Sequence, residues 1–273
     1  MGKKLHDQKG ESMMRKATKI WLITAVFLVL LGCILFVGVM TTLKWDFSKL
    51  STVKYETNTY EISESFGDIS LTTDTADIVF ALSGDGKCRV ECYEEENAKH
   101  SVSVENDTLV IKINNQKSWY DYIGFHLGSP KITVYLPKTE YSALIIREST
   151  GNIKISKDFA FVNTDISLTT GNADFRASAS KSIKIKTSTG NIHVENVSAG
   201  SLDLSVTTGM ITISSVICEG DITVGVSTGN AILTDISCEN VLSNGTTGNI
   251  SLNHVIATEK FSIERSTGYV KFN

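Results

Sequence analysis

The sequence predicts an all-β protein: a β-solenoid, similar to a parallel β-helix, of about 19–20 residues per coil, preceded by one N-terminal transmembrane helix. Two patterns indicate this. A five-residue turn, STGNI at its first occurrence, occurs seven times in exact or related form between residues 149 and 270. Near the N-terminus, residues 20–40 form an apolar stretch without a charged side chain. The chain is therefore expected to contain a short tail, a membrane span and a repetitive exterior part.

The apolar stretch is long enough to cross a bilayer, because its 21 residues match the roughly 20 that a spanning helix needs. The tail before it, residues 1–19, holds six basic and two acidic side chains, which predicts a cytoplasmic N-terminus and an extracytoplasmic C-terminal domain. A cleaved signal peptide is the alternative. It is less favoured because the stretch is long and lacks an evident small-residue cleavage site. Residues 41–60 are interpreted as a linker.

The exterior part is acidic. Without the tail, 20 Lys and Arg stand against 28 Asp and Glu, a formal net charge of −8. Nucleic acid is therefore excluded as a partner, since phosphate binding needs clustered positive charge. Cys88, Cys92, Cys218 and Cys238 show no CxxC pattern and no Cys/His spacing typical of a metal site. We predict no metal, no cofactor and no disulfide framework.

The repeat supplies the strands. Each turn contains a glycine, 19 or 20 residues after the one before it, and the residues two and four places after each glycine are apolar. Such alternation is typical of a strand with one buried face, and a second strand with the same alternation precedes each turn. A unit of this length cannot bury its apolar face alone, so the units are expected to stack as parallel, right-handed coils about 4.8 Å apart. The turn glycines are Gly151, Gly171, Gly190, Gly209, Gly229, Gly248 and Gly268.

We interpret the repeated turn as structural. Glycine suits a corner that requires a backbone conformation unfavourable for other residues. Asparagine follows the glycine in five of the seven units, and stacked asparagines can hydrogen-bond along the solenoid and relieve buried turn amides. Met210 and Tyr269 occupy this position in the other two units. The asparagines are Asn152, Asn172, Asn191, Asn230 and Asn249.

The boundary of the regular repeat is expected at residue 137, with an irregular β section and cap over residues 61–136. Within that section SFGDISL repeats the turn register, with Gly67 as the turn glycine and Ile69 and Leu71 as the inward residues. Residues 116–130 are expected to form an exposed loop. Its aromatic side chains are a candidate binding loop: Trp119, Tyr120, Tyr122 and Phe125.

The exterior part resembles the bacterial putative-adhesin family of β-strand-repeat domains, whose function is formally unknown. FGDISLTTDTADIVF, NDTLVIKI, VYLPKTEYSALII and the STGNI-like units carry the resemblance, which covers roughly residues 53–273. The resemblance implies a β-repeat fold and a membrane-linked protein of the bacterial envelope. It supplies no catalytic residues.

Catalysis receives little support. Glu219 and Glu239 each lie ten residues after a repeat glycine, so stacking would bring them near the roughly 5 Å separation of the carboxyl groups in retaining glycosidases. Both lie in turns, however, where acidic side chains are solvated, and an acid catalyst needs a pocket that raises its pKa. The five histidines share no column of the repeat, and none has a nucleophile partner at a recognisable spacing. We predict no catalytic residues and no enzyme.

The favoured function is a non-catalytic cell-envelope protein that displays a rigid extracytoplasmic β-solenoid for adhesion or for ligand or protein binding. Its expected partners are the membrane and a cell-wall glycan or an envelope protein. An envelope-stress sensor or scaffold that binds another membrane protein is the main alternative, and a carbohydrate-active enzyme is the less favoured one. The ligand, the oligomeric state and the oxidation state of Cys218 and Cys238 stay open at this point.

Overall fold

The computed structural model describes residues 2–50, 53–117 and 128–273, and its contacts divide the chain into two units. The first is built on the helical region up to Val53, and the second consists of the strands that follow Lys54.

The helical unit contains α1 (Gly2–Thr42) and the short 3-10 helix η1 (Phe47–Leu50). The segment Thr18–Thr42 of α1 contains an 18-residue window with a mean hydropathy of 3.0, and no part of that window is buried by the rest of the protein. By length and composition it can cross a membrane, which is compatible with a membrane anchor or a signal sequence.

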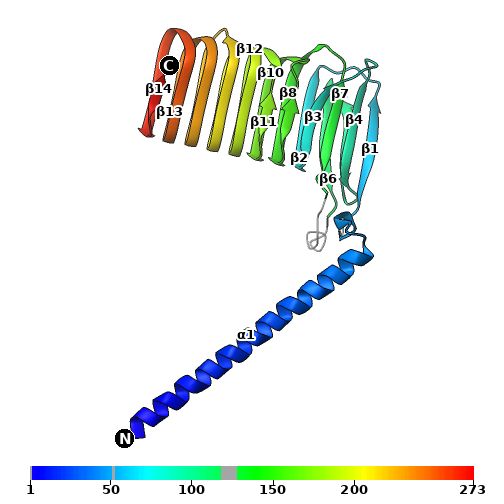
Figure 1. Ribbon diagram of the computed structural model, residues 1–273. Helices are drawn as coiled ribbons and strands as arrows, with labels where there is room; N and C mark the ends of the chain where they lie inside the picture. The colour runs from blue at the N-terminus through cyan, green and yellow to red at the C-terminus, as the bar shows by residue number, and fades with distance from the viewer. Residues whose placement is uncertain (1, 51–52, 118–127) are drawn as a thin grey trace. The chain divides into compact units, whose positions relative to one another are not determined.

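The second unit is a β-solenoid, as predicted, and its strands lie side by side from β1 to β14 (Figure 1). β12 and β13 are long because each runs through several corners without a break. The strands are β1 (Tyr55–Ile62), β2 (Asp68–Thr75), β3 (Asp77–Leu82), β4 (Cys88–Glu95), β5 (Ala98–Glu105), β6 (Thr108–Asn115), β7 (Lys131–Leu136), β8 (Glu140–Thr150), β9 (Ile153–Ile155), β10 (Ala160–Thr170), β11 (Ala173–Phe175), β12 (Ser178–Cys218), β13 (Asp221–Thr267) and β14 (Val270–Phe272).

From β8 onward the coils pair as parallel strands and place equivalent residues over one another. Leu204 pairs with Val224, Ile213 with Leu233, and the turn glycine Gly209 with Gly229. The inward apolar residues of these coils join one continuous core. The period of the sequence therefore corresponds to one turn of the solenoid.

In the cap, which we define as β1–β7, the order along the chain differs from the order in space. β2 and β3 form a coil that pairs with β8 and β9 on one side and with β6 and β7 on the other, always in parallel. The hairpin of β4 and β5 then pairs antiparallel with β7 and β6, and β1 adds to β4, also antiparallel. This antiparallel layer covers the end of the parallel stack, whose backbone groups would otherwise be open to pairing with another chain.

The expected register of SFGDISL is wrong. Ile69 pairs with Leu144, which belongs to the strand before a turn, so Gly67 is not a turn glycine. The turn of this coil lies at Ala76 and Asp77 instead, so that TADI matches TGNI. The prediction failed because Ala76 replaces the glycine: its backbone does not adopt the positive φ found at the repeat glycines, and alanine is tolerated there.

Candidate functional site

The repeated turns form a ladder of hydrogen bonds, which we call the Asn ladder. The side-chain amide of Asn172 donates to Oδ1 of Asn152 at 2.9 Å, and the backbone N–H of Asn172 donates to the same oxygen at 3.2 Å. Asn191 repeats both bonds on Asn172, at 3.0 Å each. The ladder begins at Asp77, whose Oδ1 accepts from the backbone and side-chain nitrogens of Asn152, both at 2.9 Å.

The Asn ladder lies at the surface, whereas the sequence predicted that it would hydrogen-bond to buried backbone amides of the turns. Asn152, Asn172 and Asn191 are exposed. Met210 interrupts the side-chain bonds, although its backbone N–H still donates to Oδ1 of Asn191 at 3.1 Å.

The glycines of the turn have a steric explanation. Gly190 has a φ of 141°, and a Cβ added there would lie 1.8 Å from the carbonyl oxygen of Gly171 in the neighbouring coil. No side chain fits so close to backbone, so the coils can approach in this way only where the residue that packs against this carbonyl group is glycine. Packing between neighbouring coils therefore explains why glycine recurs at this position of the repeat.

The other sequence candidates divide into two groups. The aromatic loop with Trp119, Tyr120, Tyr122 and Phe125 lies outside the described residues, and its role stays a prediction. Glu219 is exposed and lines a surface groove of about 300 Å³, but Glu239 is not among the residues that line this groove.

Cys218 and Cys238 are both buried free thiols. The residues before them, Ile217 and Ser237, are register partners in neighbouring coils. Burial, with a smaller contribution from Cys218, raises the pKa of the Cys238 thiol to about 11. These are unreactive thiols at neutral pH.

A cleft of about 540 Å³ opens in the cap, at a place that no motif in the sequence marks. Three connections supply most of its lining: residues 63–66 after β1, residues 85–87 before β4, and residues 137–139 after β7. Because β1 ends at Ile62, the cleft lies roughly 25 Å along this strand from Lys54, where the chain enters the solenoid.

The cleft combines aromatic and polar groups. Phe66 stacks on Tyr141 with ring centroids 5.9 Å apart, and the Tyr141 hydroxyl donates to the carbonyl oxygen of Pro137 at 3.1 Å. Both rings line the cleft. The polar and charged side chains around them are Glu61, Ser63, Glu64, Ser65, Asp85, Lys87, Arg89 and Thr139. A concave surface with an apolar patch and several polar groups is typical of a ligand site.

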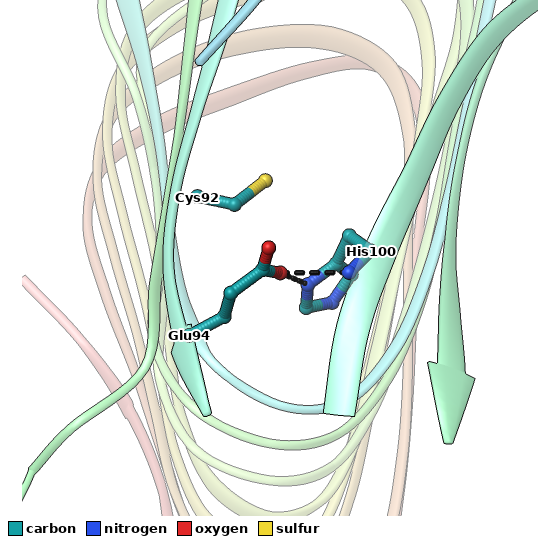
Figure 2. A group of neighbouring side chains, drawn as sticks. All are labelled: Cys92, Glu94 and His100. Atoms are coloured by element: carbon teal, nitrogen blue, oxygen red, sulfur yellow. Dashed lines mark hydrogen bonds and ion pairs between the residues drawn. The ribbon is translucent and has the colours of Figure 1, made fainter. Parts of the chain in front are cut away.

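A second cluster lies inside the cap, where Cys92 and Glu94 of β4 meet His100 of β5 (Figure 2). Alternation along β4 turns Cys92 and Glu94 to the same interior face, and the hairpin brings His100 opposite them. All three are at least 96% buried. The ring Nδ1 of His100 donates to Oε2 of Glu94 at 2.6 Å, and the backbone N–H of His100 donates to the same oxygen at 2.7 Å.

Neighbouring strands complete the bonds of this cluster. Asn58 of β1 donates from Nδ2 to Oε1 of Glu94 at 2.7 Å, and Thr73 Oγ1 of β2 lies 2.8 Å from Nε2 of His100. Burial by itself would raise the pKa of Glu94, but the hydrogen bonds from His100 and Asn58 outweigh it and lower this pKa. Burial, together with the charge of Glu94, raises the pKa of Cys92 to about 12.

Glu148 is a buried polar residue of β8, in the coil next to the cap, and is the register partner of Thr73. It is 5% exposed, and its Oε1 accepts a bond of 3.3 Å from the backbone N–H of Ala76. Burial and the charge of Asp77, opposed by this bond, raise its pKa to about 8. The carboxyl group is therefore mostly neutral at pH 7.

The sequence contained a signal for the cluster that the search for CxxC and Cys/His spacings did not detect. Cys92 and Glu94 alternate on a strand, and His100 follows after a turn at residues 96–97. Only the hairpin pairing brings the three together, so a linear spacing rule did not find them.

The comparisons with known proteins agree with the fold. A crystal structure of a putative adhesin from Bacteroides fragilis is similar with a TM-score of 0.57 and 18% identity, over 81% of this chain and 97% of that one. At such identity the likeness shows the fold alone. A putative lipid binding protein from Parabacteroides distasonis has a TM-score of 0.49 and 17% identity, over 82% of this chain and 98% of that one.

No curated protein matches the sequence. Residues 66–273, however, match a known protein family. They include most of the solenoid and all of its regular coils. The chain therefore belongs to the Toastrack DUF4097 family.

Proposed function

We propose that this protein is a non-catalytic component of the bacterial cell envelope that presents its β-solenoid outside the membrane and binds a ligand in the cap cleft. The apolar segment Thr18–Thr42 and the basic residues before it support an anchor with a cytoplasmic N-terminus. The single observation that carries the binding role is the 540 Å³ cleft at the end of β1 remote from Lys54. A rigid stack can hold such a cleft in a constant shape.

The ligand class that fits the cleft best is a cell-wall glycan. Sugar rings offer hydroxyl groups and weakly polar faces, and the cleft offers the hydroxyls of Ser63, Ser65 and Thr139 beside the stacked rings of Phe66 and Tyr141. Binding is favoured over hydrolysis because Glu61, Glu64 and Asp85 are exposed, whereas an acid catalyst requires a desolvated carboxyl group.

A protein partner, as in the sensor alternative, has weaker support. Ile217 and Ile256 are exposed by 65% and 63% on a lateral face, but Ser237 of the intervening coil separates them. They do not form the contiguous apolar patch that is typical of a protein interface.

The test compares cleft variants with a matched surface variant in the full-length protein purified in detergent. Binding to insoluble cell-wall glycan should weaken at least about tenfold, or about 1.4 kcal/mol, in Phe66→Ser and in Lys87→Glu. Lys186→Glu makes the same charge change at an exposed position of β12 that is not among the residues lining the cleft, and it should bind like the wild type.

Two results would contradict the proposal. If the folded cleft variants bind glycan normally while Trp119→Ala loses binding, the ligand site is the aromatic loop. If the wild type binds no glycan but captures an envelope protein, the sensor or scaffold alternative is correct.

A further inference from the structure

We propose that Cys92, Glu94 and His100 bind Zn²⁺, or a divalent transition-metal ion of similar chemistry, and that this ion fastens the cap hairpin. The sulfur, a carboxylate oxygen and a ring nitrogen all lie within 4.8 Å of one another. The three side chains point toward one another inside the ring formed by the coils (Figure 2). This site is separate from the cleft and does not depend on its ligand.

The donor set selects the class of metal. Thiolate, imidazole and carboxylate together suit Zn²⁺ and related ions, whereas Ca²⁺ and Mg²⁺ prefer oxygen ligands alone. A thiolate and a carboxylate neutralise the charge of a divalent ion. A neutral site is far less costly in this apolar interior than an isolated charge would be.

The groups around the three ligands orient them as outer contacts do at known metal sites. Thr73 engages Nε2 of His100, and Asn58 engages Oε1 of Glu94, which leaves Nδ1 and Oε2 facing each other. Two such atoms bound to one tetrahedral ion lie roughly 3.3 Å apart, given bonds of about 2.0–2.2 Å. The present distance of 2.6 Å would therefore have to increase by less than about 1 Å.

A route to the site exists on the side of His100. This residue lines a cavity of about 110 Å³ together with Asp74, Glu95 and Lys117, and Lys117 forms an ion pair of 2.6 Å with Glu95.

Metal binding forms a bond to the Cys92 sulfur and releases the thiol proton to solvent. The imidazole proton, which Nδ1 now donates to Glu94, would reside on Nε2, where Thr73 Oγ1 accepts it. No oxidant, reductant or further reactant is required.

The experiment uses the full-length protein in detergent, treated with chelator and titrated with Co²⁺, which reports its ligands by absorption. We expect one Co²⁺ per chain, a thiolate-to-cobalt charge-transfer band and the visible bands of a tetrahedral site, all of which Zn²⁺ should abolish. Cys92→Ser should lose the charge-transfer band. Cys88→Ser should retain it, because Cys88 lies on the same buried face of β4 but outside the cluster.

A second measurement covers variants that fold poorly. Zn²⁺ should raise the unfolding midpoint of the wild type, and Glu94→Gln should reduce this rise. The proposal is overturned if the folded wild type shows no thiolate–cobalt band, or if the band survives Cys92→Ser. Loss of the band in Cys218→Ser alone would place the metal at Cys218 and Cys238 and would also overturn it.

Discussion

The regular coils from β8 to β14 and the cap from β1 to β7 use polar residues in opposite ways. In the regular coils the repeated polar side chains of the turns face solvent, and the buried polar residues beyond Glu148 are neutral: Thr164, Thr187 and Ser243. In the cap, and in the coil directly next to it, acidic side chains are buried: Glu94, Glu95 and Glu148.

In the regular coils the polar side chains follow the repeat, whereas in the cap they form specific contacts with one another. The backbone of each regular coil is hydrogen-bonded to the neighbouring coils, and its repeated polar side chains face solvent. These side chains therefore need no hydrogen-bond partner in the interior. In the cap, antiparallel pairing brings unlike residues together, and a buried group such as Glu94 requires individual partners. The candidate cleft and the candidate metal site both lie in this irregular part.

The largest effect should come from breaking the stack itself. Gly190→Val places a branched side chain where a Cβ would lie 1.8 Å from backbone at a φ of 141°, so we expect a loss of roughly 4 kcal/mol or failure to fold. Gly84→Val is the control, because a Cβ at Gly84 meets nothing within 4 Å. Urea unfolding measures both. Equal stability of the two variants would mean that the coils do not approach as described.

Removing His100 should be the next largest change. His100→Ala leaves the buried carboxylate of Glu94 without its ring partner, which we expect to cost about 3 kcal/mol. His254→Ala serves as control, since that side chain is 82% exposed beside Asp235 and should change stability by less than about 0.5 kcal/mol. Chemical unfolding of both variants in chelator gives the comparison without metal. A small effect at His100 would show that the cap tolerates the buried charge.

Glu148 should make stability depend on pH. Its folded pKa of about 8 lies above the usual value of 4.5, so its contribution is fully present below pH 4.5 and is lost as pH rises through 8. Between pH 5 and 7 the wild type should lose roughly 2 kcal/mol relative to Glu148→Gln. Glu140→Gln changes an exposed carboxyl on the same strand and should not alter the slope. Parallel pH profiles of wild type and Glu148→Gln would refute the assignment.

The Asn ladder should contribute less, because it is exposed. Asn191→Ala removes the donor to Asn172 and the acceptor for the Met210 backbone, at a cost of about 1 kcal/mol. Met210→Asn should stabilise slightly by completing the ladder. Thermal unfolding and glycan binding are measured together. If Asn191→Ala abolishes binding while the midpoint is unchanged, the turns are a recognition surface.

The smallest effect should come from the charged column on the outside of the coils. Lys184 and Asp203 form an ion pair of 3.9 Å in which both side chains are 43% exposed. Lys184→Ala should change stability by less than about 0.5 kcal/mol in urea unfolding. A loss above about 1 kcal/mol would indicate a network along the column.

The solenoid follows from the sequence pattern, because stacking turns a constant spacing of residues along the chain into a constant position in space. The glycines at 19–20 residue intervals and the apolar positions after them were sufficient to predict parallel coils and a continuous core. The apolar stretch of α1 was also predictable, since its length and composition are read directly from the sequence and decide whether it can cross a membrane.

The arrangement of the cap depends on long-range strand pairing and does not follow from the sequence pattern. There the strands pair out of sequence order, so that β2 lies between β6 and β8. The turn between β2 and β3 has Ala76 in place of the repeat glycine, so the glycine pattern does not mark it. The cleft and the cluster of Cys92, Glu94 and His100 depend on these pairings. Their residues come from strands and loops whose contacts are long-range, and no local spacing specifies such contacts.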